Sequence, residues 1–529
     1  MHSLTDSSRV SLSRACWISL SVLSAVLLNL SFPFPGISIL AWISLVPFYF
    51  VLMTGSLKRA VVGGMITAFV FNIVYLFWMK EYKHPASLPG GIVGEMGYFL
   101  FAVILSWFLY HWVSFRRAGF LRELALPLGW VAIDYLKTIG YLAFPWGILG
   151  YSQFRNLLMI QSASIFGVWG ISFIMYYFNA TAAVLVADLL KKRDKRRSVM
   201  SGAVVCGLIL LSVLFGFVKL GEEHTGGRTK RVALVQPNFD PWSPDLEGNI
   251  MKEIDLTQDA LEYDPDLIVW SESSVPFLFD FYLQQNNRYA RLVHDYFAYI
   301  RKPVIFGSIE VSGEYIENES GGDFYNVAIF YKEGRKQGVY RKIHLVPFGE
   351  WFPYKRLFPW VARILEEAGA GDFKPGTAYS VFQNDGLKFS ALICYEDIFG
   401  NLTRKFVQKG SRLLVNVTND AWTNSPKFEL QHFSISIFRS IENRVSLVRC
   451  ANGGVTACVD PYGRVIGSLP VFTTDLLVCD VPVSEEGRLT FYSRHGDLLP
   501  WLFIAFIVTI VIVALVKKYI DTMRNKNNM

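Results

Sequence analysis

The chain has 529 residues, of which 52% are hydrophobic, 15% aromatic and 18% charged. The charged share is below the roughly 25% of an average soluble protein, and the mean hydropathy is +0.31. This composition excludes a disordered chain, a collagen-like chain and a fully soluble protein. It is typical of a membrane protein, so the net charge of +7 has to be interpreted from where the charges fall.

Eight apolar runs predict membrane-spanning helices, seven before residue 220 and one near the C-terminal end. Most are long enough to cross a hydrocarbon core of about 30 Å. Asp134 and Lys137 interrupt the fifth run, and an ionisable pair within a span usually faces protein or water rather than lipid. The predicted spans are residues 15–31, 37–53, 61–78, 92–112, 124–139, 162–186, 199–218 and 498–516.

Lys and Arg in the connecting segments fall mainly on one side of the predicted membrane. One set of alternate segments carries seventeen of them and the other set carries three. The richer side is expected to be cytoplasmic, so both termini are predicted in the cytoplasm, and topology rather than a nucleic-acid partner explains the basic excess. The seventeen are Arg9, Arg14, Lys58, Arg59, Arg116, Arg117, Arg122, six in KKRDKRR at 191–197 and four after residue 516; the three are Lys80, Lys83 and Arg155.

Residues 221–500 form a polar block in which strand-like and helix-like segments alternate. Val, Ile and Leu dominate the strand-like runs, which indicates sheets buried on at least one face in a layered α/β domain. Longer amphipathic segments at 249–262 and 429–443 predict helices. The strand-like runs are residues 231–236, 267–272, 303–311, 325–331, 389–395, 412–418 and 455–460.

Three polar segments stand at or just after the ends of strand-like runs. Glu272 follows LIVWS, Lys342 and Glu350 lie in YRKIHLVPFGE, and Cys394 lies in LICYED. Ligands usually bind outside the carboxyl ends of the strands of an α/β sheet. We therefore expect these side chains to share one crevice.

Each of these residues alone has an ordinary structural explanation. A lone Cys at a strand end is usually a small buried hydrophobe, and a lone Glu or Lys is usually a solvated charge. A buried Cys gains nothing from the adjacent Glu396 and Asp397, however, whereas a nucleophilic Cys needs a base for its proton and a cation for a developing oxyanion. A Cys–His pair with His344 or His432 lacks any protease-like local signature.

Other chemistries have no motif in the sequence. There is no HExxH, Walker loop or GxGxxG, which argues against a zinc peptidase, a nucleoside triphosphatase and a Rossmann domain. The six cysteines form no C-x-x-C pair, so neither a disulfide framework nor a zinc site is expected. No metal ion and no other cofactor is expected.

The trio of Glu272 in WSES, Lys342 in YRKIHLVPFGE and Cys394 in CYED resembles the Glu–Lys–Cys triad of the nitrilase superfamily. The phrases LVPFGE and CYED, followed by NDAW at 419–422, resemble more specifically the apolipoprotein N-acyltransferase family. The phrases FPWG and VQPN earlier in the chain are also similar to that family. The resemblance covers nearly the whole chain.

This resemblance implies a membrane α-helical bundle of eight transmembrane helices plus an α/β nitrilase-like domain folded as an α-β-β-α sandwich. The implied domains are a seven-helix membrane module at 1–220, an extracytoplasmic catalytic domain at 221–497, and a final span with a cytoplasmic tail at 498–529. It also implies a multi-pass protein of the bacterial inner membrane whose catalytic domain lies on the periplasmic face.

The resemblance further implies transfer of an acyl chain from a glycerophospholipid, typically phosphatidylethanolamine, to the N-terminal amine of a diacylglyceryl-cysteine lipoprotein. In that reaction Glu272 would be the general base, Cys394 the nucleophile that forms a thioester, and Lys342 an oxyanion donor together with backbone N–H groups near Tyr395. Glu350 would orient Lys342 or take part in proton transfer. A monomer is expected. The residues expected to shape the pocket are Trp242, Tyr395, Glu396 and Trp422.

Two alternatives come from other interpretations of the same residues. A membrane-tethered nitrilase or amidase could act on a small C–N substrate, but a tether needs only one span. A non-catalytic membrane scaffold could keep the fold, but it has no need of all three triad residues.

Two aromatic stretches, at 276–283 and 351–360, follow the candidate catalytic segments. One explanation is burial in the domain core. We favour loops that dip into the bilayer interface, where Trp, Tyr and basic residues are stable, and that line a lipid portal. Phe358 and Trp360 are then expected to contact the lipid substrate.

Overall fold

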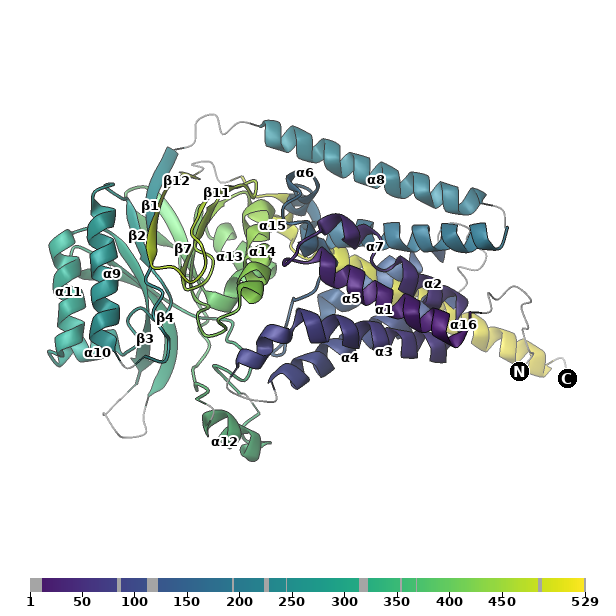
Figure 1. Ribbon diagram of the computed structural model, residues 1–529, viewed down its shortest axis with the longest axis horizontal. Coiled ribbons are helices and arrows are strands. Elements are labelled where there is room, and N and C mark those ends of the chain that lie inside the picture. Colours follow the sequence, from purple (N-terminus) through teal and green to yellow (C-terminus); the bar gives the residue numbers. More distant parts are fainter. Residues whose placement is uncertain are drawn as a thin grey trace. The chain divides into compact units, whose positions relative to one another are not determined.

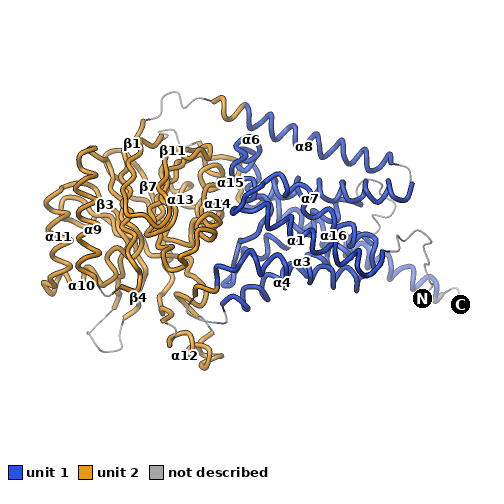
Figure 2. Tube along the Cα trace, viewed as in Figure 1, with its two compact units in different colours: residues 1–79, 86–217, 497–529 blue, residues 80–85, 218–496 orange. Residues whose placement is uncertain are grey.

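The computed structural model describes residues 12–82, 87–111, 122–192, 195–222, 228–243, 245–313, 322–352, 354–367, 369–483 and 488–527 (Figure 1). The chain divides into two compact units (Figure 2). Unit 1 comprises residues 1–79, 86–217 and 497–529, and unit 2 comprises residues 80–85 and 218–496. Of the charges counted above, Arg9, Lys83, Arg116, Arg117 and Arg193 lie outside the described residues.

The described residues of unit 1 are built of helices that pack side by side (Figure 1). Local sequence explains several of their ends, because the side chains of Ser13 and Ser56 accept hydrogen bonds from the first turns of α1 and α3. The helices are α1 (Arg14–Ser31), η1 (Ser38–Trp42), α2 (Val46–Thr54), α3 (Leu57–Tyr75), η2 (Phe77–Glu81), α4 (Ser87–His111), α5 (Ala125–Leu136), η5 (Leu149–Gln153), α6 (Leu157–Ile160), α7 (Ala163–Leu190), α8 (Arg196–Gly221) and α16 (Leu498–Asn527).

Six of the described helices are long and apolar enough to cross a membrane, namely α1, α3, α4, α7, α8 and α16. The chain is therefore a multi-pass membrane protein. The other two predicted spans correspond to shorter apolar segments, Ser38–Thr54 and Ala125–Leu136. At 1.5 Å per residue, the latter is about 18 Å long, well short of a bilayer core. The predicted number of eight spans is not confirmed.

The ionisable pair predicted to face protein does so. Asp134 is 8% exposed and Lys137 is 4% exposed. Lys137 Nζ lies 3.0 Å from Glu95 Oε2 on α4 and donates to the carbonyl of Trp146 at 2.5 Å, while the Tyr176 hydroxyl donates to Asp134 at 2.6 Å. Polar partners inside unit 1 thus replace water for these charges.

Unit 2 contains two six-stranded sheets that pack face to face. Their strand orders are β12-β1-β2-β3-β4-β5 and β11-β10-β9-β8-β7-β6, with β1, β2 and β3 parallel in the first and β7, β8 and β9 parallel in the second. The strands are β1 (Arg228–Gln236), β2 (Leu267–Trp270), β3 (Val304–Ser312), β4 (Asp323–Lys332), β5 (Arg335–Arg341), β6 (Phe382–Asn384), β7 (Leu387–Ile393), β8 (Leu413–Asn419), β9 (Ser446–Asn452), β10 (Ala457–Val459), β11 (Val465–Ser468) and β12 (Asp475–Val483).

Helices cover the outer face of each sheet, which gives a four-layer domain (Figure 1). α9 and α11 cover the first sheet, whereas α13 and α14 cover the second. The apolar faces of α9 and α11 meet the inner strands in a core that includes Trp270, Phe297 and Phe306. The helices are α9 (Leu246–Leu261), α10 (Phe279–Gln284), α11 (Arg288–Ile300), α12 (Pro359–Glu367), η6 (Cys394–Ile398), α13 (Gly400–Gln408), α14 (Pro426–Asn443) and α15 (Phe491–His495).

The lipid-portal prediction is wrong for the first aromatic stretch, 276–283. Phe279 is fully buried and belongs to the core between the first sheet and its helices, with Phe277 and Tyr282 packed against that core. The aromatic residues here supply packing area rather than a membrane contact. The second stretch is different, because no residue of α12 is buried.

Candidate active site

Two carboxylates and an ammonium meet at the ends of the first sheet's strands. Lys342, directly after β5, is 1% exposed and lies 2.9 Å from Glu350 Oε1 and 3.4 Å from Glu272 Oε1. Asn326 of β4 donates through Nδ2 to Glu272 Oε1 and to Glu350 Oε1, both at 2.8 Å. The backbone N–H of Asn419 donates to the other oxygen of Glu272 at 3.0 Å. The structure therefore brings together Glu272, Lys342 and Glu350, as the sequence predicts.

Electrostatics keeps Lys342 charged at this site. Burial alone would lower the pKa of Lys342, but the carboxylates of Glu350 and Glu272 outweigh burial and raise that pKa well above its usual value. Because an ammonium is a donor only, it is suited to hold an oxygen that becomes negative during a reaction.

Cys394 lies at the end of β7, in the first position of η6. Its backbone has φ 51°, the left-handed region that non-glycine residues rarely adopt. Asn416 of β8 donates to its carbonyl at 3.1 Å. Burial, followed by the charge of Glu272, raises the pKa of the Cys394 thiol, while Lys342 lowers it in part. The thiol is therefore protonated at neutral pH and needs a base to become a nucleophile.

Glu396 holds the turn that carries Cys394 through several hydrogen bonds. Its Oε1 accepts hydrogen bonds from the Tyr340 hydroxyl at 2.7 Å and from the backbone N–H groups of Ile343 and His344 at 2.7 and 3.0 Å. Its Oε2 accepts from the Ile393 N–H at 2.9 Å. Burial raises the pKa of Glu396 to about 7 despite these donors. Glu396 thus ties the turn that carries Cys394 to the segment after β5.

The predicted pocket aromatics fall into two groups. Tyr395 is 9% exposed and packs against Phe399, with ring centroids 5.2 Å apart. Trp422 packs against Phe428 at 5.2 Å. Trp242 is 58% exposed, and Phe358 and Trp360 are 47% and 64% exposed. A role for these three in substrate binding stays a prediction.

The two histidines considered above have other partners. The His344 ring lies against Phe399 with centroids 3.9 Å apart, and burial, assisted by Lys342, lowers its pKa to about 4. His432 lies 2.8 Å from Asp397 through Nε2. Neither arrangement resembles a Cys–His pair.

Several residues at this site carried no local sequence signal. Asn326 bridges the two carboxylates from the middle of an ordinary strand, and Tyr82 packs its ring against Trp422 from a segment preceding α4. Gly307 matters because an added Cβ would lie 2.7 Å from Glu272 Cα. The sequence signals were the strand ends and the short motifs around them, which placed Glu272, Lys342 and Cys394. Within the described ranges, no group of three His, Cys, Asp or Glu could hold a metal ion.

The fold and the residues at its strand ends define a carbon-nitrogen hydrolase domain attached to membrane helices. Residues 231–490 match the family model described as "Carbon-nitrogen hydrolase", and residues 24–181 match that of the "Apolipoprotein N-acyltransferase N-terminal domain". An amidase of the nitrilase superfamily from Nesterenkonia is similar over 48% of this chain and 92% of its own, with 21% identity and a TM-score of 0.36.

Relatives that match over almost their whole length identify the family more narrowly. "Apolipoprotein N-acyltransferase 1" of Treponema denticola is 32% identical, covering 93% of this chain and 94% of the relative. "Apolipoprotein N-acyltransferase" of Geobacter metallireducens is 33% identical, covering 95% of this chain and 96% of the relative. The chain belongs to the apolipoprotein N-acyltransferase family.

Proposed function

We propose that this protein transfers an acyl chain from a phospholipid, through a thioester on Cys394, to the N-terminal amine of a diacylglyceryl-cysteine apolipoprotein. The observation that carries this proposal is the buried Lys342 ammonium, held between Glu272 and Glu350 beside the nucleophile turn. Membership in the family, over almost the whole chain, supports the choice of substrates.

The first half-reaction loads the enzyme. The Glu272 carboxylate takes the thiol proton as Cys394 Sγ attacks the ester carbonyl carbon of the phospholipid. The carbonyl oxygen becomes an oxyanion held by Lys342 Nζ and by backbone N–H groups near Tyr395. The ester C–O bond then breaks, the departing alcohol oxygen takes the proton from Glu272, and a lysophospholipid leaves a thioester behind.

The second half-reaction discharges the enzyme. The acceptor's neutral amine attacks the thioester carbonyl, Glu272 takes a proton from the nitrogen, and the C–S bond breaks as the proton returns to sulfur. Glu350 keeps Lys342 charged and in place through both steps. Both substrates supply their own reactive groups, and the donor is already an activated ester.

The remaining features of the proposal follow from the family and from the charge bias. The acyl donor is phosphatidylethanolamine and the acceptor a diacylglyceryl lipoprotein at the same membrane. The protein is a monomer of the bacterial inner membrane with both termini cytoplasmic and the domain at 221–497 periplasmic. Trp242, Trp422, Phe358 and Trp360 line the path of the lipid.

The test uses purified protein with phosphatidylethanolamine labelled in its acyl chains and no acceptor. Wild-type protein should accumulate a label that neutral hydroxylamine releases. Cys394→Ala should carry none and Cys394→Ser at most a trace, because a hydroxyl is far harder to deprotonate than a thiol. Lys342→Ala should load on the order of 10²–10³-fold more slowly, the usual cost of a lost oxyanion donor. Glu272→Ala should also load poorly, because it lacks the base that takes the thiol proton.

The acceptor completes the test. A diacylated lipopeptide with a free N-terminal amine should discharge the label and become labelled itself, whereas its N-acetylated counterpart should not. Label that persists in Cys394→Ala would remove Cys394 as the nucleophile. Wild-type protein that hydrolyses a small amide but never loads from phospholipid would favour a tethered amidase.

A further inference from the structure

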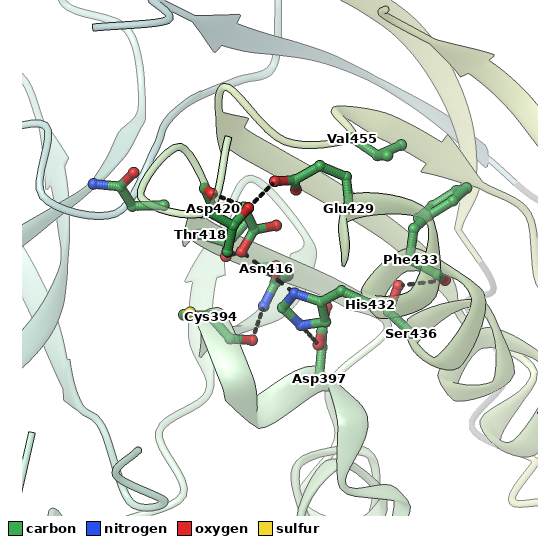
Figure 3. A network of polar contacts seen from close by, with 12 residues as sticks. Cys394, Asp397, Asn416, Thr418, Asp420, Glu429, His432, Phe433, Ser436 and Val455 are labelled. Atoms are coloured by element: carbon green, nitrogen blue, oxygen red, sulfur yellow. Dashed lines mark hydrogen bonds and ion pairs between the residues drawn. The ribbon is translucent and has the colours of Figure 1, made fainter. Parts of the chain in front are cut away.

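Beside the turn that carries Cys394 lies a cluster of buried ionisable side chains that the reaction above does not use (Figure 3). Asp397, Asp420, Glu429 and Arg449 are fully buried, and His432 is 1% exposed. They come from different elements: Asp397 from η6, Asp420 from the segment after β8, Glu429 and His432 from α14, and Arg449 from β9. Burying charged groups is costly unless they are paired, so the partners of each buried charge show what holds the cluster together.

Each basic side chain of the cluster contacts the same two carboxylates. His432 lies 2.8 Å from Asp397 through Nε2 and 3.3 Å from Asp420 through Nδ1. Arg449 lies 3.3 Å from Asp397 through Nε and 2.6 Å from Asp420 through Nη2. His432 and Arg449 therefore bridge Asp397 to Asp420 twice.

Charge balance supports this arrangement. Burial lowers the pKa of His432, and the positive charge of Arg449 lowers it further. The carboxylates of Asp397 and Asp420 outweigh both effects and raise that pKa to about 9. Burial, together with Asp420, raises the pKa of Glu429 well above its usual value. His432 Nδ1 and Arg449 Nη2 lie 3.0 Å apart, because both nitrogens approach the same carboxylate, that of Asp420.

The two bridged carboxylates belong to the two halves of the proposed active site. Asp397 lies in η6, the turn that begins at Cys394. Asp420 directly follows Asn419, whose N–H donates to Glu272 at 3.0 Å. Asp420 also accepts a hydrogen bond from Thr418 at 3.0 Å, and the Thr418 hydroxyl interacts with the Cys394 sulfur. Fixing Asp397 relative to Asp420 therefore fixes the nucleophile relative to its base.

The backbone conformation of Cys394 needs support from neighbouring residues. A non-glycine residue at φ 51° is strained and persists only when its surroundings hold it there. Asn416 and Glu396 hold the turn from one side through its backbone. The bridge holds the turn through the side chain of Asp397.

We propose that His432 and Arg449 are positioning residues of this enzyme, which by bridging Asp397 to Asp420 set the distance between the Cys394 thiol and the Glu272 carboxylate. The inference rests on the proposed function. Neither residue touches substrate or gives up a proton to it. Their loss slows formation of the thioester without weakening the binding of phospholipid.

The test measures single-turnover loading of full-length protein from labelled phosphatidylethanolamine in detergent micelles. His432→Gln places an amide near the position of Nε2 and keeps the contact with Asp397, whereas His432→Asn places one near Nδ1 and keeps the contact with Asp420. Because each variant keeps only half of the bridge, both should lower the maximal loading rate by about 10- to 100-fold, the cost of a misplacement near 1 Å. The half-saturating phospholipid concentration should not change.

The control is Ser436→Ala on the same helix. Ser436 is fully buried, and its hydroxyl donates to the carbonyl of Phe433, on the same helix, at 2.9 Å. This variant should load at the wild-type rate. Arg449→Lys keeps the charge but cannot reach both carboxylates, so it should load as slowly as the His432 variants. It tests the bridge independently if the His432 variants fail to fold. The folded fraction of every variant is measured by thermal unfolding.

Loading at the wild-type rate by the two His432 variants would overturn the inference. So would a loss no greater than the loss of folded protein, or a raised half-saturating concentration at an unchanged maximal rate. A failure of the proposed function is distinct, because then wild-type protein itself does not load from phospholipid. In that event the pH profile of Cys394 alkylation by iodoacetamide still tests the bridge, and it should differ between wild-type protein and His432→Gln.

Discussion

The ring of Tyr82 packs against the ring of Trp422, with centroids 4.1 Å apart. Tyr82 precedes α4, yet it belongs to the same compact unit as the nitrilase-like sheets. Burial raises the pKa of the Tyr82 phenol, and the nearby Cys394 and Asp420 raise it further. A residue from the helical part of the sequence therefore forms part of the wall beside the proposed nucleophile.

Removal of this ring should weaken the binding of the acyl donor. Aromatic pairs contribute about 0.5–1.5 kcal/mol beyond their buried area, so Tyr82→Ala should raise the half-saturating phospholipid concentration by roughly 2- to 10-fold. Tyr82→Phe keeps the ring and should stay close to wild type. Loading assays at several phospholipid concentrations measure this, and a Phe variant as impaired as the Ala variant would indicate that the hydroxyl, rather than the ring, is required.

Asn326 should matter because its side chain, like that of Lys342, donates to both Glu272 and Glu350. Asn326→Ala should slow loading by at least about 10-fold, since each carboxylate loses a partner worth roughly 1.5–3 kcal/mol to a charged group. Asn384→Ala is the matched control, because Asn384 is also buried but bonds to Lys332 and Asp266 instead. Equal loss in both variants would point to general destabilisation.

The exposed aromatic residues near α12 provide a test of the lipid path. Phe358→Ser and Trp360→Ser should lower loading from membrane-embedded phospholipid several-fold while leaving thermal unfolding unchanged, because both side chains are largely exposed. Reaction with a short-chain soluble ester should be retained. Tyr299→Ser, at a residue of α11 that is 77% exposed, is the control. Impairment towards both donors would contradict a membrane role.

Stability should depend on pH through His432, which faces Asp397, Asp420 and Arg449. Its folded-state pKa of about 9 exceeds an unfolded value of about 6.5. A raised pKa means that this contribution, on the order of 3 kcal/mol, is fully present below pH 6.5 and is lost as pH rises through 9. The difference in unfolding temperature between wild type and His432→Gln should therefore shrink from pH 6 to pH 10. A difference that grows with pH would show that His432 is neutral.

The orientation predicted from the charge bias can be tested with reporter fusions. A reporter fused after Gly221 should be active only outside the cytoplasm, and fusions after Lys192 and Lys518 should report the cytoplasm. The cause is the excess of Lys and Arg in one set of segments. A cytoplasmic signal at Gly221 would place the catalytic domain in the wrong compartment.

Several parts of the site could be predicted because each follows a strand with a clear apolar pattern. The strands at 231–236, 267–272 and 389–395 correspond to β1, β2 and β7, so the residues at their ends were also found. β9 was missed. It contains Arg449, which interrupts the apolar run and is buried because it pairs with Asp397 and Asp420. Such pairing depends on distant segments and leaves no local signal.

The apolar runs at 37–53 and 124–139 predicted longer helices than the structure contains. Hydropathy does not reveal where a helix stops inside an apolar run. The run at 37–53 is divided into a short η1 and α2, which has Pro47 in its first turn. The run at 124–139 ends as a helix at Leu136, and the chain then turns so that Lys137 bonds to the Trp146 carbonyl.

The ion pair between Lys137 and Glu95 has a consequence for biogenesis. Asp134 and Lys137 would each cost about 2.5–3.5 kcal/mol at the centre of a membrane-inserted helix, and α5 is too short to offset that cost with apolar length. Glu95 on α4 and Tyr176 on α7 supply the partners that make both charges tolerable. We therefore expect α5 to leave the translocon only alongside α4 and to remain loosely held until α7 has been synthesised.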